Sequence, residues 1–401
     1  MPAVNAAKRA RAAAVPASGG GDGIGALPDE LLHHVLSFLP AQQAVRTCVL
    51  ARRWLHLWKS ATGLRVVGAD GEAPADFDEI REFVDSLLLL RGRSPLETFE
   101  LRVTGDDVSV RRLRLWISYA VQCEVKVLRV SILCCFPVLL RAEDPPLASG
   151  HLTNIQLSGL VFQGDFLDFS RCPALRRLQI KDCSIIHAGR ISSQSLRHLT
   201  IKGCRFSKSS HTRIHAPNLA SLMLHVIDGK TPVLERMPFL VWALVVTCGF
   251  RCDCGNCGGQ QDDSSCVLLQ GTSEAKSLHL ASRSQMYVFR KDLKWCPTFS
   301  RLKNLLLNEY WCVPDVHGLA CILEHSPVLE DLRLLLFYKL PGLGQRLPNV
   351  EMIGRFNPKE LPSTISAHLK RVQVICGAVD ERVLKVLKFL SKLSISFSFK
   401  E

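Results

Sequence analysis

The stretch Leu175-Arg176-Arg177-Leu178-Gln179-Ile180-Lys181-Asp182-Cys183 places leucine or isoleucine at its first, fourth and sixth positions and a cysteine at its ninth. The alternation Leu178, Ile180 is that of a short half-buried strand. The same phrase returns twice, at Leu196-Leu199-Ile201-Cys204 and at Leu219-Leu222-Leu224-Ile227. Strands that recur in this way predict a stack of repeats, because no single unit buries its own apolar face.

Looser copies of the phrase extend this pattern over most of the chain. They begin at Leu96, Val125, Leu152, Leu240, Leu302, Leu329 and Leu369. Repeats of 20 to 29 residues are typical of leucine-rich repeats, and the starts at 152, 175, 196 and 219 fall in that range, whereas later spacings reach 27 and more. The fold class is therefore α/β, with an irregular leucine-rich-repeat solenoid over residues 63–340, in which Cys183 and Cys204 fill repeat turns with small buried side chains.

The polar positions between the apolar ones predict a binding face. They align in columns: Lys181 with Lys202 and His225, Arg177 with His198 and Ser221, and Gln179 with Thr200 and Met223. A basic strip of Arg177, Lys181, His198, Lys202 and His225 on the inner curve of the solenoid would suit an acidic or phosphorylated partner. An ordinary solvated face remains an equal alternative.

Residues 26–62 differ from the repeats in composition. Pro28, Asp29 and Glu30 suit a first helical turn, and Leu31, Leu32, Val35, Leu36 and Leu39 recur at helical spacing. Further short helices are predicted at 41–48 and 50–59. Three helices this short hold more large apolar side chains than their own core can bury, so we expect a docking surface.

This segment resembles an F-box in the version common in plants. The resemblance rests on Leu27-Pro28-Asp29-Glu30-Leu31-Leu32, on Val35-Leu36-Ser37-Phe38-Leu39-Pro40, and on 45–54 with Trp54, Leu57 and Trp58; it departs from the family at Leu55, usually polar or basic. It implies binding to a Skp-family adaptor and, through it, to a cullin. The family positions that bury against the adaptor correspond to Leu27, Pro28, Glu30, Leu31, Leu36, Leu39 and Trp54.

The chain has 401 residues, of which 47% are hydrophobic and 22% charged, and this excludes a wholly disordered protein. No apolar stretch reaches the roughly 20 residues of a membrane span. The net charge of +13 raises nucleic-acid binding, but the basic residues are interleaved with acids and no groove-reading motif occurs. We expect a protein of the nucleus and/or cytoplasm. Residues 1–25 are expected to form a flexible leader, in which Lys8-Arg9-Ala10-Arg11 resembles a weak nuclear signal. A transit peptide is the alternative interpretation of the same residues.

The 16 cysteines are mostly expected to be reduced and buried. A cluster in the insertion 248–266 allows a second interpretation. Cys252, Cys254, Cys257 and Cys266 can in principle close a tetrahedral zinc site, although a second CxxC is missing. An insertion between repeats without metal is the simpler interpretation, and no cofactor is predicted.

Residues 341–401 form a connector followed by a predicted strand at 369–376 and an amphipathic helix at 380–390. Such a unit suits the end of a solenoid, and the order resembles the FBD module of plant F-box proteins. No spacing typical of a metalloprotease or of a serine hydrolase occurs, so we predict a non-catalytic protein. The resemblance implies a substrate-recognition subunit of a Skp-cullin-F-box ubiquitin ligase, with a target protein on the repeats. The alternatives are a sensor of a small anion or hormone and a scaffold outside ubiquitin transfer.

Overall fold

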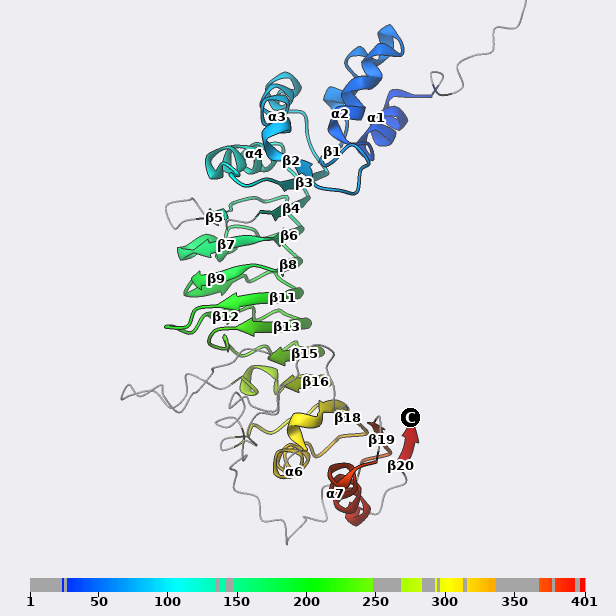
Figure 1. Ribbon diagram of the computed structural model, residues 1–401, viewed down its shortest axis with the longest axis vertical. Coiled ribbons are helices and arrows are strands. Elements are labelled where there is room, and N and C mark those ends of the chain that lie inside the picture. Colours follow the sequence, from blue (N-terminus) through cyan, green and yellow to red (C-terminus); the bar gives the residue numbers. More distant parts are fainter. Residues whose placement is uncertain are drawn as a thin grey trace, which may run out of the picture.

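The computed structural model describes residues 24, 27–134, 138–140, 147–247, 268–282, 293, 296–312, 316–336, 368–376, 379–393 and 397–400. Its main feature is a stack of parallel strands that runs the length of the molecule (Figure 1). In order of pairing, the ladder is β1 (Gly63–Val66), β3 (Thr98–Thr104), β4 (Val127–Leu133), β6 (Asn154–Ser158), β8 (Arg177–Lys181), β11 (His198–Phe206), β13 (Ser221–Asp228), β15 (Trp242–Thr247), β16 (Ser277–Ser282), β17 (Asn304–Asn308), β18 (Asp331–Leu336), β19 (Arg371–Cys376) and β20 (Phe397–Lys400).

The repeat phrases predicted this ladder with three omissions. Each phrase supplies one strand, which confirms the predicted stack of repeats. Strand β1 was not predicted, because no phrase begins before Leu96. Strand β16 was not predicted, because Ala275 stands where the phrase has its first leucine; the alanine is nevertheless fully buried, as are Leu278 and Leu280. Strand β20, after the C-terminal helix, was also not predicted.

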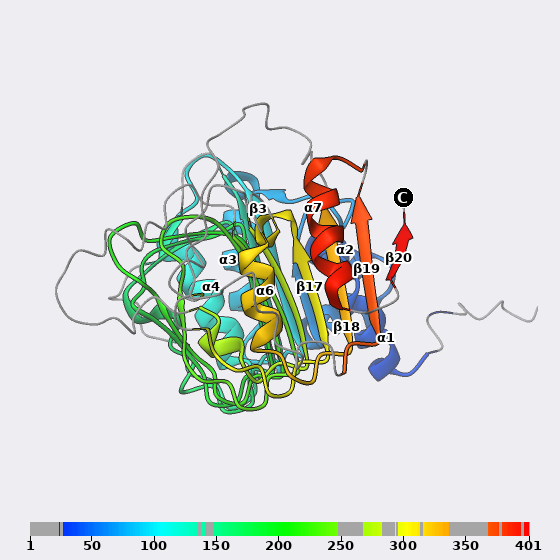
Figure 2. The same cartoon turned by 90° about the horizontal axis from the view of Figure 1, so that it is seen from below.

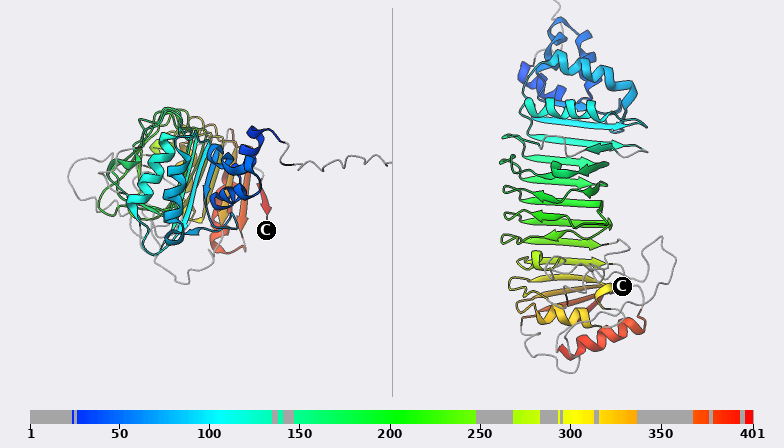
Figure 3. Two further views of the ribbon diagram at one scale, coloured as in Figure 1. Left: turned by 90° about the horizontal axis from the view of Figure 1, so that it is seen from above. Right: turned by 90° about the vertical axis from the view of Figure 1, so that its left-hand side faces the viewer.

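Shorter strands close the turns of the stack. A second ladder joins β5 (Val138–Leu140), β7 (Leu160–Gln163), β9 (Ser184–His187) and the end of β11. A separate sheet holds β10 (Arg190–Ser192), β12 (Arg213–His215) and β14 (Val233–Leu234), and β2 (Ala75–Asp76) pairs with β3. The right-hand view in Figure 3 shows the resulting pile of parallel layers.

The core is the set of side chains that each strand points inward. Leu178, Leu222 and Leu332 have no exposed surface. The repeat-turn cysteines are buried as predicted: Cys183 is 2% and Cys204 0% exposed. The hydrogen bond between the two thiols, together with burial, raises the pKa of Cys183 far above its ordinary value. Cysteine at this position therefore packs as a small apolar group.

The N-terminal helices are shorter than predicted. They comprise α1 (Asp29–Ser37), α2 (Ala41–Arg46) and three 3-10 turns, η1 (Thr47–Val49), η2 (Arg52–Leu55) and η3 (Leu57–Ser60). The short helix predicted over 41–48 is confirmed as α2 and the start of η1, whereas the prediction of one helix over 50–59 was wrong. The extended backbone of Ala51 (φ −162°, ψ 163°) separates η1 from η2, and His56 (φ −122°) separates η2 from η3, so no continuous helix forms.

Longer helices flank the sheet at both ends of the stack. Helices α3 (Phe77–Arg91) and α4 (Val110–Gln122) follow the N-terminal helices, and α6 (His317–Glu324) and α7 (Glu381–Leu390) lie at the C-terminal end. Viewed along the stack (Figure 2), α3, α4 and α6 cover one side of the ladder. The opposite side is called the open face below. The predicted C-terminal strand and helix are present as β19 and α7, with Asp380 as N-cap.

The remaining 3-10 turns are η4 (Gly164–Leu167), η6 (Gln270–Thr272), η7 (Glu309–Trp311) and η9 (Ser391–Leu393). None of the helices among the described residues has the length and apolar content of a membrane span.

Candidate functional site

The N-terminal helices expose an apolar surface. Leu31, Val35 and Phe38 follow one another along a single side of α1, because residues at i, i+4 and i+7 share a helix face. They are 50%, 46% and 61% exposed. Val49, the last residue of η1, and Leu50, which follows it, are 83% and 66% exposed. Together with Leu55, which is half exposed, these side chains form what we call the apolar docking surface.

The predicted adaptor-binding residues divide into two groups. Pro28, Glu30 and Leu31 are exposed, and Leu27 and Leu39 are partly buried against the core. Leu36 and Trp54, by contrast, are only 1% and 5% exposed and pack inside this chain. In this structure the last two residues support the docking surface from behind. Contact with an adaptor stays a prediction for all seven.

Sequence reasoning missed Val35, Phe38, Val49 and Leu50 as docking residues. For the first two the signal was present in the helical spacing, since Leu32 and Leu36 occupy the opposite, buried side of α1. An ion pair fixes the unit: Arg53 Nη2 lies 2.6 Å from Asp29 Oδ1 and also donates to the carbonyl oxygen of Leu27. The start of α1 is thereby tied to η2.

The open face carries the predicted columns in register. In the ladder Arg177 pairs with His198, Lys181 with Lys202, and Lys202 with His225. The prediction of the three columns is therefore confirmed. Arg177, His198 and Lys202 are exposed, while Lys181 and His225 are half-buried. Neither Lys181 nor Lys202 forms an ion pair with any of the described residues.

The basic strip continues toward the N-terminal end of the ladder, where the sheet is hollowed. The hollow has a volume of about 390 Å³ and is lined mainly by polar side chains: Glu100, Arg102, Arg129, Ser131, Gln156, Ser158, Gln179 and Lys181. Glu100 accepts from Arg65 Nε at 2.9 Å and from Arg102 Nη2 at 2.6 Å. Burial opposes ionisation of Glu100, but these two arginines outweigh it and lower its pKa.

The other half of the open face mixes apolar and polar side chains. Beyond β13 the same columns hold the half-buried apolar side chains of Trp242, Leu244, Val246, Leu306 and Leu335, together with His279, Asn304, Arg333, Arg371 and Gln373. The ring of Trp242 meets that of His279 edge-on at 5.8 Å. Sequence reasoning missed this half because the columns were aligned over only three repeats. The face thus has a polar, basic half and a mixed half in which β15 presents apolar side chains around Trp242, an arrangement suited to a protein segment that carries acidic and apolar groups.

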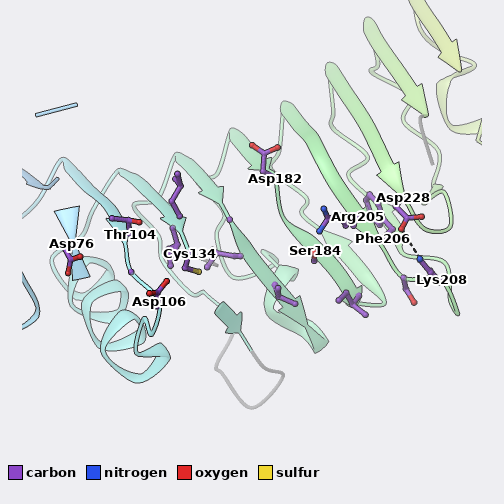
Figure 4. Close-up of a pocket in the computed structure, with 18 of the residues that line it drawn as sticks. Asp76, Thr104, Asp106, Cys134, Asp182, Ser184, Arg205, Phe206, Lys208 and Asp228 are labelled. Atoms are coloured by element: carbon purple, nitrogen blue, oxygen red, sulfur yellow. Dashed lines mark ion pairs between the residues drawn. The ribbon is translucent and has the colours of Figure 1, made fainter. Parts of the chain in front are cut away.

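A larger groove of about 1330 Å³ runs along the edge of the stack, where successive strands end (Figure 4). Its charged lining comes from several repeats: Asp76, Asp78, Asp106, Asp182, Arg205, Lys208 and Asp228. Lys208 Nζ lies 3.1 Å from Asp228 Oδ2. The described residues around the groove include no histidine. It is therefore a mixed-charge surface in which aspartates predominate.

The candidate zinc ligands Cys252, Cys254, Cys257 and Cys266 lie outside the described residues, so that interpretation stays a prediction.

Comparisons with known proteins place these features in a family. A model of the F-box domain matches residues 24–63, and a model described as "FBD-associated F-box protein At5g56370, LRR repeats" matches residues 100–236. The MEIOTIC F-BOX protein MOF of Oryza sativa subsp. japonica is 30% identical over 353 residues, which is 78% of this chain and 71% of the relative. This chain belongs to the plant F-box proteins with leucine-rich repeats. The F-box/FBD/LRR-repeat protein At5g22700 of Arabidopsis thaliana is 27% identical to this chain, in an alignment that covers 94% of this chain and 91% of the relative.

Membership of the F-box family indicates what the N-terminal helices do. F-box proteins are generally non-catalytic adaptors of ubiquitin ligases, and an F-box implies a Skp-family protein as partner. The F-box match at 24–63 covers α1, α2 and the three 3-10 turns, so it contains the whole apolar docking surface.

Proposed function

We propose that this protein is the substrate-recognition subunit of a Skp-cullin-F-box ubiquitin ligase. The observation that carries the proposal is the apolar docking surface within the F-box. Exposed apolar patches of this kind mark protein interfaces. Five of the six side chains of the docking surface are between 46% and 66% exposed, and the sixth, Val49, is 83% exposed. Burying them against an adaptor recovers the stabilisation that they lack in the free chain, at roughly 25 cal/mol per Å².

The open face supports the second half of the proposal. Repeat arrays use extended sheet faces to bind partners, and here Lys181 and Lys202 present charges that no described residue pairs. We infer that the target contributes acidic or phosphorylated groups to the basic half and apolar side chains to the half around Trp242. The ligase then acts by proximity, because a bound target lysine meets the charged conjugating enzyme in an effectively intramolecular encounter.

A location in the nucleus and/or cytoplasm belongs to the same proposal. Seven of the described cysteines are buried as free thiols, which is typical of proteins kept in a reducing compartment.

The test is capture of a purified Skp-family adaptor by the full-length protein. The double variant Val49→Asp, Leu50→Asp places two charges in the docking surface without touching the core, and we expect at least about 100-fold weaker binding, or about 2.7 kcal/mol. The matched control is Leu89→Asp, Leu90→Asp on α3, where the leucines are 83% and 58% exposed outside the F-box. It should bind as wild type.

Two results contradict the proposal. One is a wild-type protein that does not bind the adaptor. The other is an equal loss in both double variants, because that would make the loss a general effect of surface charge.

A further inference from the structure

Two cysteines and a histidine meet on the helix-covered side of the stack, away from the docking surface and the open face. Cys321 lies in α6 and His325 caps its C-terminus, so the spacing of four residues puts both on one helix face. Cys296 comes from the segment that precedes β17. The ligand atoms of the three residues all lie within 4.8 Å of one another.

The surroundings orient these side chains. Cys321 is 5% exposed, and Cys296 and His325 are half-buried. His325 Nδ1 lies 2.8 Å from the carbonyl oxygen of Cys321. A carbonyl only accepts, so Nδ1 carries the hydrogen and Nε2 keeps its lone pair. A hydrogen bond of this kind from the non-ligating nitrogen is the usual support of a metal-bound histidine.

We propose that Cys296, Cys321 and His325 bind a zinc ion. Thiolate and imidazole are the ligands that zinc prefers, at about 2.3 Å and 2.0–2.1 Å respectively, which corresponds to ligand separations of roughly 3.5 Å in a tetrahedron. The separations between the three ligand atoms therefore need to shorten by about 1.3 Å at most. His317 is the candidate fourth ligand: it lies one turn before Cys321 on the same face of α6, and its Nε2 is buried.

The ion would join two consecutive repeats. Cys296 precedes β17, and α6 precedes β18. These segments already meet through a backbone hydrogen bond of 2.8 Å from Phe299 N to the carbonyl oxygen of His325. Zinc would fix the same junction with bonds that do not depend on apolar burial, so the site is structural.

The experiment uses the full-length protein with Cys252, Cys254, Cys257 and Cys266 all replaced by Ser, so that the cysteine-rich insertion contributes no metal. We expect about one zinc ion per chain by elemental analysis, and with Co²⁺ as probe the charge-transfer and d–d absorption of a tetrahedral thiolate site. Cys296→Ser and His325→Gln should each reduce the zinc affinity at least about 10-fold. Cys376→Ser is the control, because Cys376 is equally a buried thiol, 7% exposed, but lies outside the cluster.

Three results would overturn the site: no zinc or cobalt bound in the four-serine background, an equal loss in Cys376→Ser, or a disulfide between Cys296 and Cys321 in protein purified without reductant. Cys296 and His325 are both half-buried, so their variants are expected to fold, and circular dichroism checks this.

Discussion

The F-box and the repeat array use similar amounts of leucine and valine in opposite ways. In the array, the inward side chains of β4, β8, β13 and β18 are fully buried, as Leu178 and Leu222 illustrate. In the F-box, Phe38, Val49 and Leu50 are all more than 60% exposed. The array stabilises itself by stacking, whereas the F-box leaves apolar surface for a partner. The exposure of an apolar side chain therefore separates the residues that stabilise the fold from those that are available to a partner.

The two regions are nevertheless joined by buried polar contacts. Arg91, at the end of α3, is 4% exposed and donates to the carbonyl oxygens of Trp58 and Ala61. Arg65, on β1, donates both to Glu100 of the array and to the carbonyl oxygen of Phe38 in the F-box. In the proposed ligase, these contacts would hold a target on the open face in a defined position relative to the adaptor.

The largest expected effect tests the comparison directly. Leu178→Ala removes a fully buried side chain from the middle of the ladder and leaves a cavity, so we expect the free energy of unfolding to fall by about 3 kcal/mol. Leu50→Ala, at 66% exposure, should change it by less than about 0.5 kcal/mol. Chemical denaturation of the full-length variants measures both values.

Similar losses at the two positions would break the comparison, because Leu50 would then be part of a core. The companion measurement is adaptor capture, in which Leu50→Ala should bind more weakly and Leu178→Ala should bind normally below its unfolding temperature.

The strand positions could be predicted because each inward leucine is required locally. The phrase failed at β16 because Ala275 fills the first position, where a small side chain is buried but does not match the leucine pattern. The open-face columns followed from the parallel pairing, in which equal positions of successive repeats must lie side by side.

The form of the F-box could not be predicted in the same way. Helical spacing is compatible with one helix over 50–59, and the extended conformation of Ala51 results from packing that brings Trp54 and Trp58 into the core. Likewise, the family pattern does not distinguish residues that face a partner from those that support them, so Leu36 and Trp54 were grouped with Leu31. The Cys296–Cys321–His325 cluster joins residues about 25 positions apart, which only the stacking of repeats brings together.

A glycine pair sharpens the account of stacking. Gly159 has φ +73°, and a Cβ there would lie 1.8 Å from the carbonyl oxygen of Ile132 in the neighbouring repeat. Gly92, after α3, has a similar φ of +66° but nothing within 4 Å of its Cβ position. Both Gly→Ala variants incur the cost of a positive φ, of order 1 kcal/mol, and Gly159→Ala should add the cost of separating two repeats. We expect a total of about 2 kcal/mol for Gly159→Ala in thermal unfolding. Equal losses of stability in the two variants would contradict this, because the backbone at Ile132 would then move away from the added Cβ at no measurable cost.

The smallest expected effect concerns the junction between the two regions. Arg102 and Arg65 lower the pKa of Glu100 below its ordinary value of 4.5, despite burial. A carboxylate whose pKa is lower in the folded state stabilises the fold above its unfolded pKa, and this contribution is lost as the pH falls through the folded pKa. Wild type should therefore lose stability below about pH 4.5, and Glu100→Gln should lose less stability over the same interval while being less stable than wild type at pH 7.

Glu97→Gln is the control, because Glu97 is exposed and its ion pair with Lys126, at 3.0 Å, lies on the surface. Parallel pH profiles for wild type and Glu100→Gln would show that Arg65 holds the F-box to the array through the carbonyl oxygen of Phe38 and not through Glu100.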